Sequence, residues 1–561
     1  MGLLNAKVKL EKGWKKGKNG NITYVYVPVE KTYHKDKKYT TESRKVIGQL
    51  MDDGYVHINE NFRVLFPDKE VIYLDENKAE KKSSAIKIGG TTVINKLMNE
   101  LQINDLIKEC FGSSLEEKED ICNSINDLVC HQIINESAVA QHYNHFIFNH
   151  PNKNRTMNND VEIGSFYKNL ETTIGTKLFF KKWNKLNNKN SRIFVSYDST
   201  NHPNYSRDNG VTLNELGKAK VHENIPQINI AYAVQQVTGI PLFYEIYNGS
   251  VNDVEQGKKI ADFAKDIGIN SINMIFDRGY FCEKTVDELM KYGFGFLMMI
   301  KTSNTAFKNI ILDDEFVKDD PVNFIIGEDV YAQTIEANLF KNDLPAEKRF
   351  FHVYYSEEQF LKEKTEFNYI FQERLKYLNE YPDDYKNSNN DFDDYIQKTI
   401  DRNGEISFSS NQSAISNKMK EYGYFCLVSS MKLTAEEALD LYRGRDVVEK
   451  LFRTLKTHLD ANVDRVHSDK SIYSKSFITF ISAIIRNEIF QKTKKLRVKN
   501  KKDYTVPEII YELEDIEVVK SLNKTYHMQS CLTKKQKVLF NALNCTLRDV
   551  DIATSKLNNG L

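Results

Sequence analysis

The stretch L-Y-R-G-R-D-V-V-E-K-L-F-R-T-L-K at residues 441–456 decides how the rest of this chain is interpreted. Its Tyr442, Arg445, Glu449 and Lys456 are spaced three, four and seven residues apart, and on an α-helix the last three fall within roughly 60° of Tyr442. One helix face therefore carries a carboxylate between two cations and a phenol, a surface suited to handling phosphate. An apolar face to anchor the helix is provided by Leu441, Val447, Val448, Leu451, Phe452 and Leu455.

An ordinary amphipathic surface helix is the alternative interpretation of the same stretch. In that case Arg445 and Glu449, and then Glu449 and Arg453, form i,i+4 pairs that only face water. Taken alone, the stretch does not separate the two interpretations, because charged stripes usually face solvent. Acidic residues elsewhere in the chain favour the first.

Two upstream aspartates follow apolar runs that are typical of buried strands. The run at 191–198 ends at Asp198, and the run at 272–277 ends at Asp277, which is followed by Arg278. Ligands of open α/β sheets bind beyond the carboxyl ends of strands. A cap or turn role is the ordinary explanation for either aspartate alone, but together with the helical stripe they predict a shared site.

The segments around these aspartates predict a mixed sheet with helices packed on it. The expected elements are strands at 228–237, 240–247 and 294–300, helices at 254–267 and 283–292, and a hairpin turn at Thr238 and Gly239. Carboxylates without nearby histidine or cysteine favour a hard cation, Mg²⁺ or Mn²⁺ rather than zinc. Three acids from three elements can hold two such ions about 4 Å apart, as in-line displacement at phosphorus requires.

The order Tyr, two residues, Arg, three residues, Glu, six residues, Lys resembles the YREK signature of bacterial insertion-sequence transposases of the IS-four type. These enzymes have a ribonuclease H-like core. The motifs Y-D-S-T at 197–200 and F-D-R-G-Y-F at 276–281 resemble that family's first and second acidic motifs. The likeness covers about residues 190–490.

The resemblance implies roles for the residues at the matching positions. Asp198, Asp277 and Glu449 would form the DDE triad that binds two Mg²⁺ ions, with Mn²⁺ as a substitute. Contact with DNA near the cleaved transposon end would come from Tyr442, Arg445 and Lys456, and also from Arg278.

A long interval separates the second and third acids. Asp277 and Glu449 lie 172 positions apart, which implies an insertion after the strand near 300, where family members carry a mostly β insertion. In some relatives a tryptophan of the insertion stacks on a flipped base, but this chain has only Trp14 and Trp183. Other aromatic side chains of the insertion are candidates for stacking, although such a run is more often a strand with a buried face: Phe350, Phe351, Tyr354 and Tyr355.

Composition bounds the class of protein. A chain of 561 residues with 40% hydrophobic content can form three or four domains. Its seven cysteines lack C-x-x-C spacing, which predicts reduced thiols in a cytoplasmic protein. The resemblance implies that this protein is bacterial and nucleoid-associated. We expect no membrane segment, because the longest apolar run, 476–485, is about half a span, and no signal-peptide core begins the chain.

Net charge is zero, which is unusual for a nucleic-acid-binding protein, but the charge is unevenly distributed. Residues 1–50 hold twelve Lys or Arg against four acids, and residues 492–502 hold seven against none. We expect the acidic tract at 383–394 to form a flexible loop away from DNA; its acids are Asp383, Asp384, Asp391, Asp393 and Asp394.

The expected fold class is α/β, a ribonuclease H-like mixed-sheet core interrupted by a β-rich insertion. We expect the chain to divide into a basic β-rich module at 1–75 that includes the strand 22–27 and the basic run 35–38, a helical DNA-binding region at 85–185, core segments at 190–302 and 421–470, the insertion at 303–420 and a helical region at 471–561. Within the insertion, 356–379 predicts a helix, and 424–430 a strand that returns to the core. Thr434 and Glu437 have the spacing of a capping box that starts a helix.

The leading hypothesis is a Mg²⁺-dependent DNA transposase that cleaves transposon ends and joins the exposed 3′-hydroxyl to target DNA. Its partners would be double-stranded DNA, both terminal inverted repeats and target, and a second copy of the chain in a homodimer. Alternatives are a nuclease of the same fold that does not join ends and a catalytically silent DNA-binding derivative. Other polar residues near the motifs are expected to be turn or surface groups: Asp208, Asp253, Asp446, His458 and Asp460.

Overall fold

The computed structural model describes residues 3–20, 22–34, 38–73, 82–154, 156–187, 193–205, 210–216, 225–312, 318–340, 348–387, 390–402, 404–496, 504–521 and 525–559. These residues form two compact units, Met1–Ser83 and Ser84–Leu561. The basic positions 35–37 and 497–502 and Asp208 lie outside the described residues.

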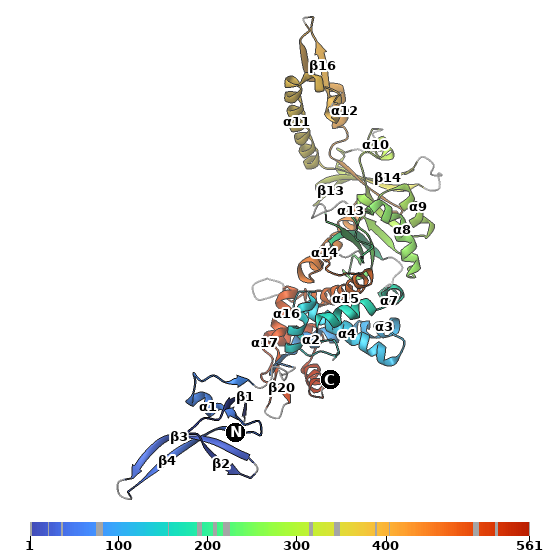
Figure 1. Ribbon diagram of the computed structural model, residues 1–561. Helices are drawn as coiled ribbons and strands as arrows, with labels where there is room; N and C mark the ends of the chain where they lie inside the picture. Colours follow the sequence, from blue (N-terminus) through green and yellow to red (C-terminus); the bar gives the residue numbers. More distant parts are fainter. Residues whose placement is uncertain are drawn as a thin grey trace. The chain divides into compact units, whose positions relative to one another are not determined.

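The first unit is a six-stranded antiparallel sheet in the order β2-β3-β4-β5-β1-β6 (Figure 1). Its elements are β1 (Leu3–Lys9), β2 (Lys15–Asn19), β3 (Ile22–His34), β4 (Tyr39–Leu50), β5 (Tyr55–Asn59), α1 (Glu60–Leu65) and β6 (Ile72–Tyr73). The alternation expected at 22–27 is confirmed, because Val25 and Val27 of β3 are buried against Phe62 of α1. Beyond Pro28, β3 pairs only with β4, and its side chains are exposed on both faces.

A nine-stranded mixed sheet organises the second unit, in the order β10-β9-β8-β11-β12-β18-β15-β14-β13. Its strands are β8 (Phe194–Pro203), β9 (Gln227–Gln235), β10 (Pro241–Asn248), β11 (Asn273–Phe276), β12 (Gly295–Ile300), β13 (Phe324–Ile325), β14 (Val330–Ala337), β15 (Arg349–Tyr355) and β18 (Tyr424–Ser429). Pairing is parallel for β8 with β11 and for β11 with β12, and antiparallel elsewhere. The expected strands and the hairpin at Gly239, whose φ is +69°, are confirmed.

One expectation for this sheet is wrong. The first acidic strand does not end at Asp198, because β8 continues to Pro203 and Asp198 pairs with Tyr232 of β9. The antiparallel partner β9 extends well past Asp198 and keeps the ladder intact, whereas the parallel neighbour β11 stops at Phe276. Asp198 therefore lies on a strand that continues, beside one that ends.

Helices cover both faces of the sheet. Alternate residues of β11 point to opposite sides: Met274 and Phe276 join a core with α8 (Asp253–Asp266) and α9 (Glu283–Lys291), whereas Ile275 joins a second core with α13 (Ala435–Arg443). Helix α14 (Asp446–His458) packs on β8 and β9, where Phe452 contacts Tyr232 edge-to-face with ring centroids 6.1 Å apart.

The segment 303–420 is partly continuous with this sheet. It holds α10 (Thr305–Leu312), contributes β13 to β15 to the nine strands and then extends as α11 (Glu357–Glu380), the hairpin β16 (Ile396–Ile400) and β17 (Ile406–Ser410), and α12 (Gln412–Met419) (Figure 1). The flexible acidic loop expected at 383–394 is wrong for its described residues. Two 3₁₀ turns form there, and buried Asp393 accepts hydrogen bonds of 2.7 and 2.9 Å from Arg374 of α11.

The remaining helices of the second unit pack on or near α15 (Asp469–Thr493), most of which is buried. They are α2 (Gly89–Glu100), α3 (Ile103–Cys110), α4 (Leu115–Ile134), α5 (Tyr143–Asn149), α6 (Asp160–Asn169), α7 (Thr172–Asn187), α16 (Val506–Glu514), α17 (Lys534–Ala542) and α18 (Leu547–Asn558). A small sheet that the sequence did not predict joins β7 (Ala85–Lys87), β19 (Glu517–Lys520) and β20 (Tyr526–Met528).

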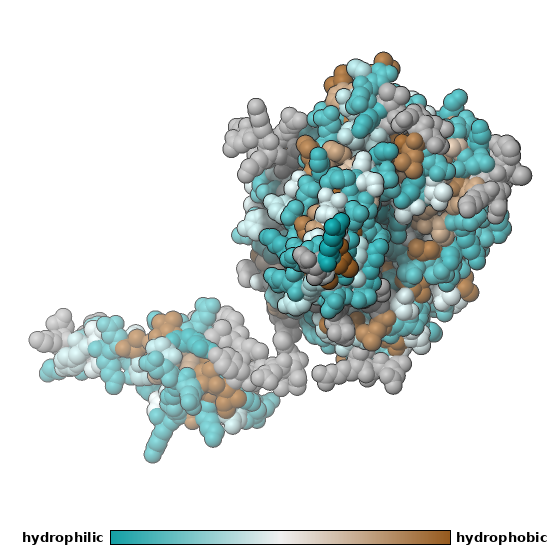
Figure 2. All heavy atoms as spheres, turned by 90° about the horizontal axis from the view of Figure 1, so that it is seen from above, coloured by the Kyte–Doolittle hydropathy of each residue, from teal (hydrophilic) through white to brown (hydrophobic). Residues whose placement is uncertain are grey.

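Helix α15 contains the longest apolar run of the chain, residues 476–485, but it is not apolar enough over its length to span a membrane. No helix among the described residues has both the length and the hydropathy to cross a bilayer. On the face drawn in Figure 2, hydrophilic side chains predominate and apolar ones occur in small groups.

Candidate active site

Strand register brings the first two aspartates together. Strands β8 and β11 are parallel, with Tyr197 paired to Phe276. The residue that follows each of these two is an aspartate, Asp198 after Tyr197 and Asp277 after Phe276. Asp198 is also directly opposite Tyr232 of β9, and cross-strand partners share a face of the sheet. Because Tyr232 packs on Phe452 of α14, Asp198 faces that helix.

The stretch that carries the other site residues is not one continuous helix, and this expectation is wrong. Helix α13 ends at Arg443 and α14 begins at Asp446, with a tight turn at Gly444 and Arg445. The Arg445 N–H donates to the Tyr442 carbonyl at 3.1 Å, an i to i−3 bond in place of the i to i−4 bond to Leu441. The four residues of the stripe are thus divided between α13, the turn and α14.

A side chain from the sheet stabilises this break. Gln236, just beyond β9, donates from Nε2 to the Leu441 carbonyl at 2.8 Å and to Ser196 Oγ of β8 at 2.9 Å. It therefore supplies a hydrogen-bond donor to the Leu441 carbonyl, which the Arg445 N–H would bond in a continuous helix. Gly444 allows the close approach, because a Cβ there would lie 3.1 to 3.2 Å from three atoms of the Gln236 side chain. The residue Gln236 was missed by sequence reasoning, since nothing local marks it.

Arg445 joins the three acidic residues. Its Nη1 lies 3.4 Å from Asp198 Oδ2 and 3.8 Å from Asp277 Oδ2, and its Nη2 lies 3.2 Å from Glu449 Oε1. Burial alone would lower the pKa of Arg445, but the charges of Asp277, Asp198 and Glu449 together raise it above the usual value. One guanidinium thus contacts all three carboxylates, which come from β8, the end of β11 and α14.

Exposure rises across this cluster. The Asp198 and Arg445 side chains are each 16% exposed, whereas those of Asp277 and Glu449 are 43% and 53% exposed. The site therefore has an inner wall at β8 and an open side at Asp277 and Glu449. A large charged substrate can reach that open side without entering the core.

The remaining predicted site residues are Tyr442, Arg278 and Lys456. Tyr442 donates its hydroxyl hydrogen to Asp277 Oδ1 at 3.3 Å, and burial, followed by the Asp277 charge, raises the pKa of this phenol. Arg278 is exposed, and its backbone N–H donates to Asp277 Oδ1 at 2.7 Å. Lys456 is half-buried on α14, about two turns after Glu449. The structure therefore places Tyr442 in contact with the acids and Arg278 and Lys456 on the flanking elements.

The donor set suits a hard divalent cation, but the acids are not yet arranged around one. Within the described part of the chain, no group of three or more His, Cys, Asp or Glu is positioned to hold a metal ion. The carboxylate oxygens of Asp198, Asp277 and Glu449 are the ligand type that Mg²⁺ prefers, and they already converge on one positive charge, Arg445. The chemistry of these donors therefore fits such an ion.

Hydrogen bonds behind the acids fix the inner wall. Ser199, next to Asp198, donates to Asp253 Oδ1 at 2.7 Å, so Asp253 is a supporting partner of β8 and not merely the surface group expected for it. On the same face of β8 as Ser199, opposite to Asp198, Tyr197 donates to buried Glu245 at 2.8 Å. Burial raises the pKa of the Glu245 carboxyl to about 7.

The other polar residues expected at the surface or in turns have structural partners. Asp446 pairs with Lys450 one turn along α14 at 2.5 Å, in an exposed position. His458 lies 2.9 Å from Glu136. Asp460 accepts a hydrogen bond of 3.3 Å from the Ala138 N–H and has a φ of +49°, as turn residues do. None of these three contacts involves the acidic cluster.

Three of the four aromatic candidates for base stacking are unsuitable. Phe351, Tyr354 and Tyr355 of β15 are buried, and Tyr354 stacks on Phe425 with ring centroids 4.7 Å apart. Phe350 is half-buried. The run at 350–355 is therefore a strand with packed faces, as its alternation in the sheet requires.

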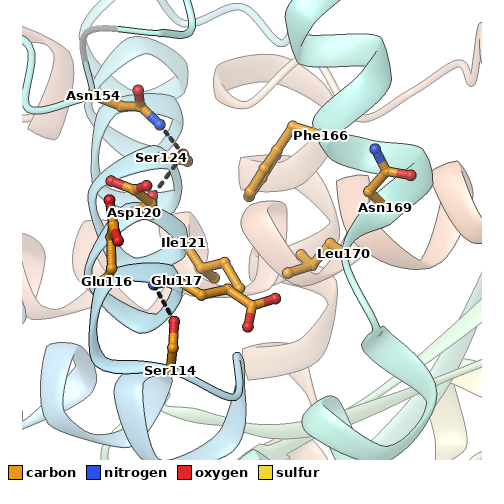
Figure 3. Close-up of a pocket in the computed structure, with 10 residues that line it drawn as sticks. All are labelled: Ser114, Glu116, Glu117, Asp120, Ile121, Ser124, Asn154, Phe166, Asn169 and Leu170. Carbon is orange, nitrogen blue, oxygen red and sulfur yellow. Dashed lines mark hydrogen bonds between the residues drawn. The ribbon is translucent and has the colours of Figure 1, made fainter.

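A surface pocket of about 400 Å³, lined by none of the residues of the Asp198, Asp277 and Glu449 cluster, lies between α4 and the end of α6 (Figure 3). Glu116, Glu117 and Asp120 line it, together with Phe166 and Leu170. The Glu117 N–H donates to Ser114 Oγ at the start of α4, which makes this acidic group part of the helix cap. Its charge disfavours phosphate, so this pocket is not the candidate site.

Comparison with known proteins identifies the class. Residues 189–487, more than half of the chain, match the family model described as transposase DDE domain. The chain therefore belongs to this family, the DDE transposases, whose shared function is DNA transposition and whose members generally use divalent metal ions.

Structural comparison gives only a weak similarity. A structure of the piggyBac transposase synaptic complex with hairpin DNA aligns with a TM-score of 0.34 and 8% identity over 76% of each chain. A similarity at that level supports no conclusion about fold or function. No curated protein sequence matches the chain.

Proposed function

We propose that this protein is a Mg²⁺-dependent insertion-sequence transposase of the IS-four, YREK type, which cleaves transposon ends and joins them to target DNA. Asp198, Asp277 and Glu449 are its catalytic acids. The observation that carries the proposal is the contact of all three carboxylates with Arg445, at 3.2 to 3.8 Å, although the three acids are far apart in the sequence.

The sheet supports a ribonuclease H-like core at 190–302 and 421–470, interrupted by the insertion 303–420. The order β10-β9-β8-β11-β12 sets three antiparallel strands beside two that run parallel to β8. The first two acids lie on β8 and just after β11, which are neighbours at its centre. The third acid arrives on α14, after the insertion.

Both proposed reactions are displacements at a phosphodiester, so one site serves cleavage and joining. Two Mg²⁺ ions, with Mn²⁺ as a substitute, would be held by the three carboxylates and would activate the attacking oxygen and stabilise the leaving oxygen. The chain itself orients these ligands: the Arg278 N–H and the Tyr442 hydroxyl both bond Asp277. The Ser199–Asp253 bond holds the backbone beside Asp198.

The proposed partner is double-stranded DNA, at the terminal inverted repeats and at the target. The residues proposed to contact the transposon end are Arg278, Tyr442, Arg445 and Lys456. The basic module at 1–75 and the helical region at 85–185 are proposed as further DNA-binding parts, and pairing of two ends favours a homodimer. The proposed location is the bacterial cytoplasm, at the nucleoid, and the seven free cysteines are consistent with it.

The test is cleavage and strand transfer by the full chain with DNA that carries the element's own ends. Asp198→Asn, Asp277→Asn and Glu449→Gln should each abolish both reactions, with losses of about 10³-fold or more, because each removes a ligand of the site. End binding should remain in all three. The matched control is Asp446→Asn, which removes an exposed acid of the same helix as Glu449 and should keep activity. Full cleavage by any of the three variants contradicts the assignment.

The same assay separates the two alternative functions. A nuclease of this fold cuts an intact end but fails to join a pre-nicked end that already carries a 3′-hydroxyl. A silent derivative binds the ends but cleaves no substrate with Mg²⁺ or Mn²⁺. The C-terminal region 471–561 contributes α15 to the core of the second unit, so truncation there tests folding and not function.

A further inference from the structure

Arg445 occupies the point on which the three acids converge. The same Nη1 atom is close to Asp198 and Asp277, at 3.4 and 3.8 Å, and Nη2 is 3.2 Å from Glu449. The guanidinium also lies 5.6 Å from the centre of the Tyr442 ring. A protein cation therefore stands where a metal ion bound by these carboxylates would have to be.

Charge explains why a cation is needed there. Three ionised carboxylates this close repel one another, and Asp198 is largely withdrawn from water. Arg445 offsets one of the three formal negative charges and leaves two. The cluster is thus held together by its guanidinium and still attracts a divalent cation.

Both cations cannot be bound at once through the same oxygens. A Mg²⁺ or Mn²⁺ ion takes its oxygen ligands at about 2.0 to 2.2 Å. The Asp198 and Glu449 oxygens that would face it now accept hydrogen bonds from Arg445, and Asp277 Oδ2 lies 3.8 Å from the same guanidinium. A guanidinium beside such an ion would add repulsion between two positive groups. Entry of the metal therefore requires the guanidinium to leave.

The local backbone allows this movement. Arg445 lies in the turn between α13 and α14, not inside a helix, and it makes no side-chain cap bond to α14. Its guanidinium lies next to Asp277 and Glu449, the half-exposed acids on the open side. A change of side-chain rotamer can move the guanidinium outward while Gln236 keeps the turn in place.

We propose that Arg445 is a positioning residue that holds Asp198, Asp277 and Glu449 together in the metal-free enzyme, and that a divalent cation binds the triad by displacing its guanidinium. This rests on the proposed function of the three acids. The displaced guanidinium becomes available to a DNA phosphate, for which its planar fork is suited. Metal binding and DNA-end binding then favour each other, because coupling between two sites is reciprocal.

The test measures Mn²⁺ binding to the full chain by calorimetry or by the electron paramagnetic resonance signal of free Mn²⁺. Arg445→Gln should bind Mn²⁺ about tenfold more tightly than wild type, because the competitor is gone. Arg445→Lys keeps the charge but loses the fork, and it should fall between the two. The matched control is Arg453→Gln, an exposed arginine of α14, which should bind as wild type does.

Thermal unfolding without metal gives a second readout that does not depend on activity. Arg445→Gln should lower the melting temperature by several degrees, because the three carboxylates lose their counter-ion. Mn²⁺ should restore it, and the added change Asp198→Asn should restore part of it. The control Arg453→Gln should melt as wild type does.

The outcomes separate this inference from the proposed triad. Equal or weaker Mn²⁺ binding by Arg445→Gln, with binding that still depends on Asp198, overturns the displacement and leaves the triad standing. Wild-type affinity in Arg445→Lys overturns it as well, because charge alone would then account for the effect. An unchanged melting temperature in Arg445→Gln overturns the positioning role. Mn²⁺ binding that Asp198→Asn leaves unaltered in every variant overturns both the triad and the inference.

Discussion

Gln236 and Gly444 should be energetically coupled, because they form the break between α13 and α14 together. Gln236→Ala removes the donor to the Leu441 carbonyl and to Ser196 Oγ. Each lost hydrogen bond costs a net 0.5 to 1.5 kcal/mol, so that this variant should lose about 2 kcal/mol of unfolding free energy. Without these hydrogen bonds the ends of α13 and α14 should shift, which should displace Arg445 and Glu449 and lower the rate of DNA cleavage.

Gly444→Ala should change the unfolding free energy differently in the wild-type protein and in the Gln236→Ala variant. Alanine in a helical conformation is favoured over glycine by about 1 kcal/mol, and the φ of Gly444, −57°, permits it. With Gln236 present, the new Cβ lies 3.1 to 3.2 Å from a side-chain amide whose Nε2 is held by two hydrogen bonds. The crowding should cancel or reverse the gain, whereas in Gln236→Ala the gain should appear in full.

The double-mutant cycle measures this coupling directly. Urea unfolding of wild type, the two single variants and the double variant is followed by circular dichroism. If the m-value is the same in all four, the cycle should give a coupling energy of about 1 to 2 kcal/mol. Gly164→Ala in α6 is the matched control, because no atom lies within 4 Å of its added Cβ. It should gain about 1 kcal/mol in both backgrounds. Additivity of Gln236→Ala and Gly444→Ala within about 0.5 kcal/mol would refute the proposed role of Gln236.

Two further predictions concern buried charges behind the site. Glu245 binds its proton more tightly in the folded state, where burial raises its pKa to about 7, than in the unfolded chain. It therefore costs stability as pH rises from about 4.5 to about 7, and the unfolding free energy of wild type relative to Glu245→Gln should fall across this window by up to about 3 kcal/mol; a difference that does not vary with pH contradicts this. Lys475 lies 3.1 Å from Asp464, and both side chains are nearly buried. Lys475→Met should lose about 3 to 5 kcal/mol by leaving buried Asp464 without its cationic partner and with only His202, 3.5 Å away, beside it; adding Asp464→Asn should recover much of it, and equal stability of wild type and Lys475→Met in urea unfolding would rule this out.

Local sequence patterns were sufficient for the individual elements. The alternation at 22–27, the apolar runs before Asp198 and Asp277 and the hairpin at Gly239 each describe which side of one element is buried, and each strand is found. The capping box at Thr434 and Glu437 is present with both of its hydrogen bonds. These features depend on neighbours within a few residues, which a sequence displays directly.

The same patterns failed where distant contacts decide. The spacing at 442–456 predicts one continuous helix, but the helix is interrupted. Gln236, about 200 positions earlier in the chain, stabilises the break by donating a hydrogen bond to the Leu441 carbonyl, which has lost its helical partner. The acidic tract at 383–394 was expected to face solvent, yet Arg374 brings Asp393 into a buried pair. In each case a partner from another element satisfies a polar group that local reasoning leaves to water.

The sequence by itself determined the candidate site residues: two aspartates after apolar runs and a tyrosine, arginine, glutamate and lysine at fixed spacing. Only the tertiary structure decided that Asp198 and Asp277 lie side by side, through the parallel register of β8 and β11, and that Arg445 contacts both of them and Glu449. The physical reason is that residue spacing fixes the direction of a side chain on its own helix or strand. Strand register and helix placement depend on hydrogen bonds and packing between segments that are distant in the chain.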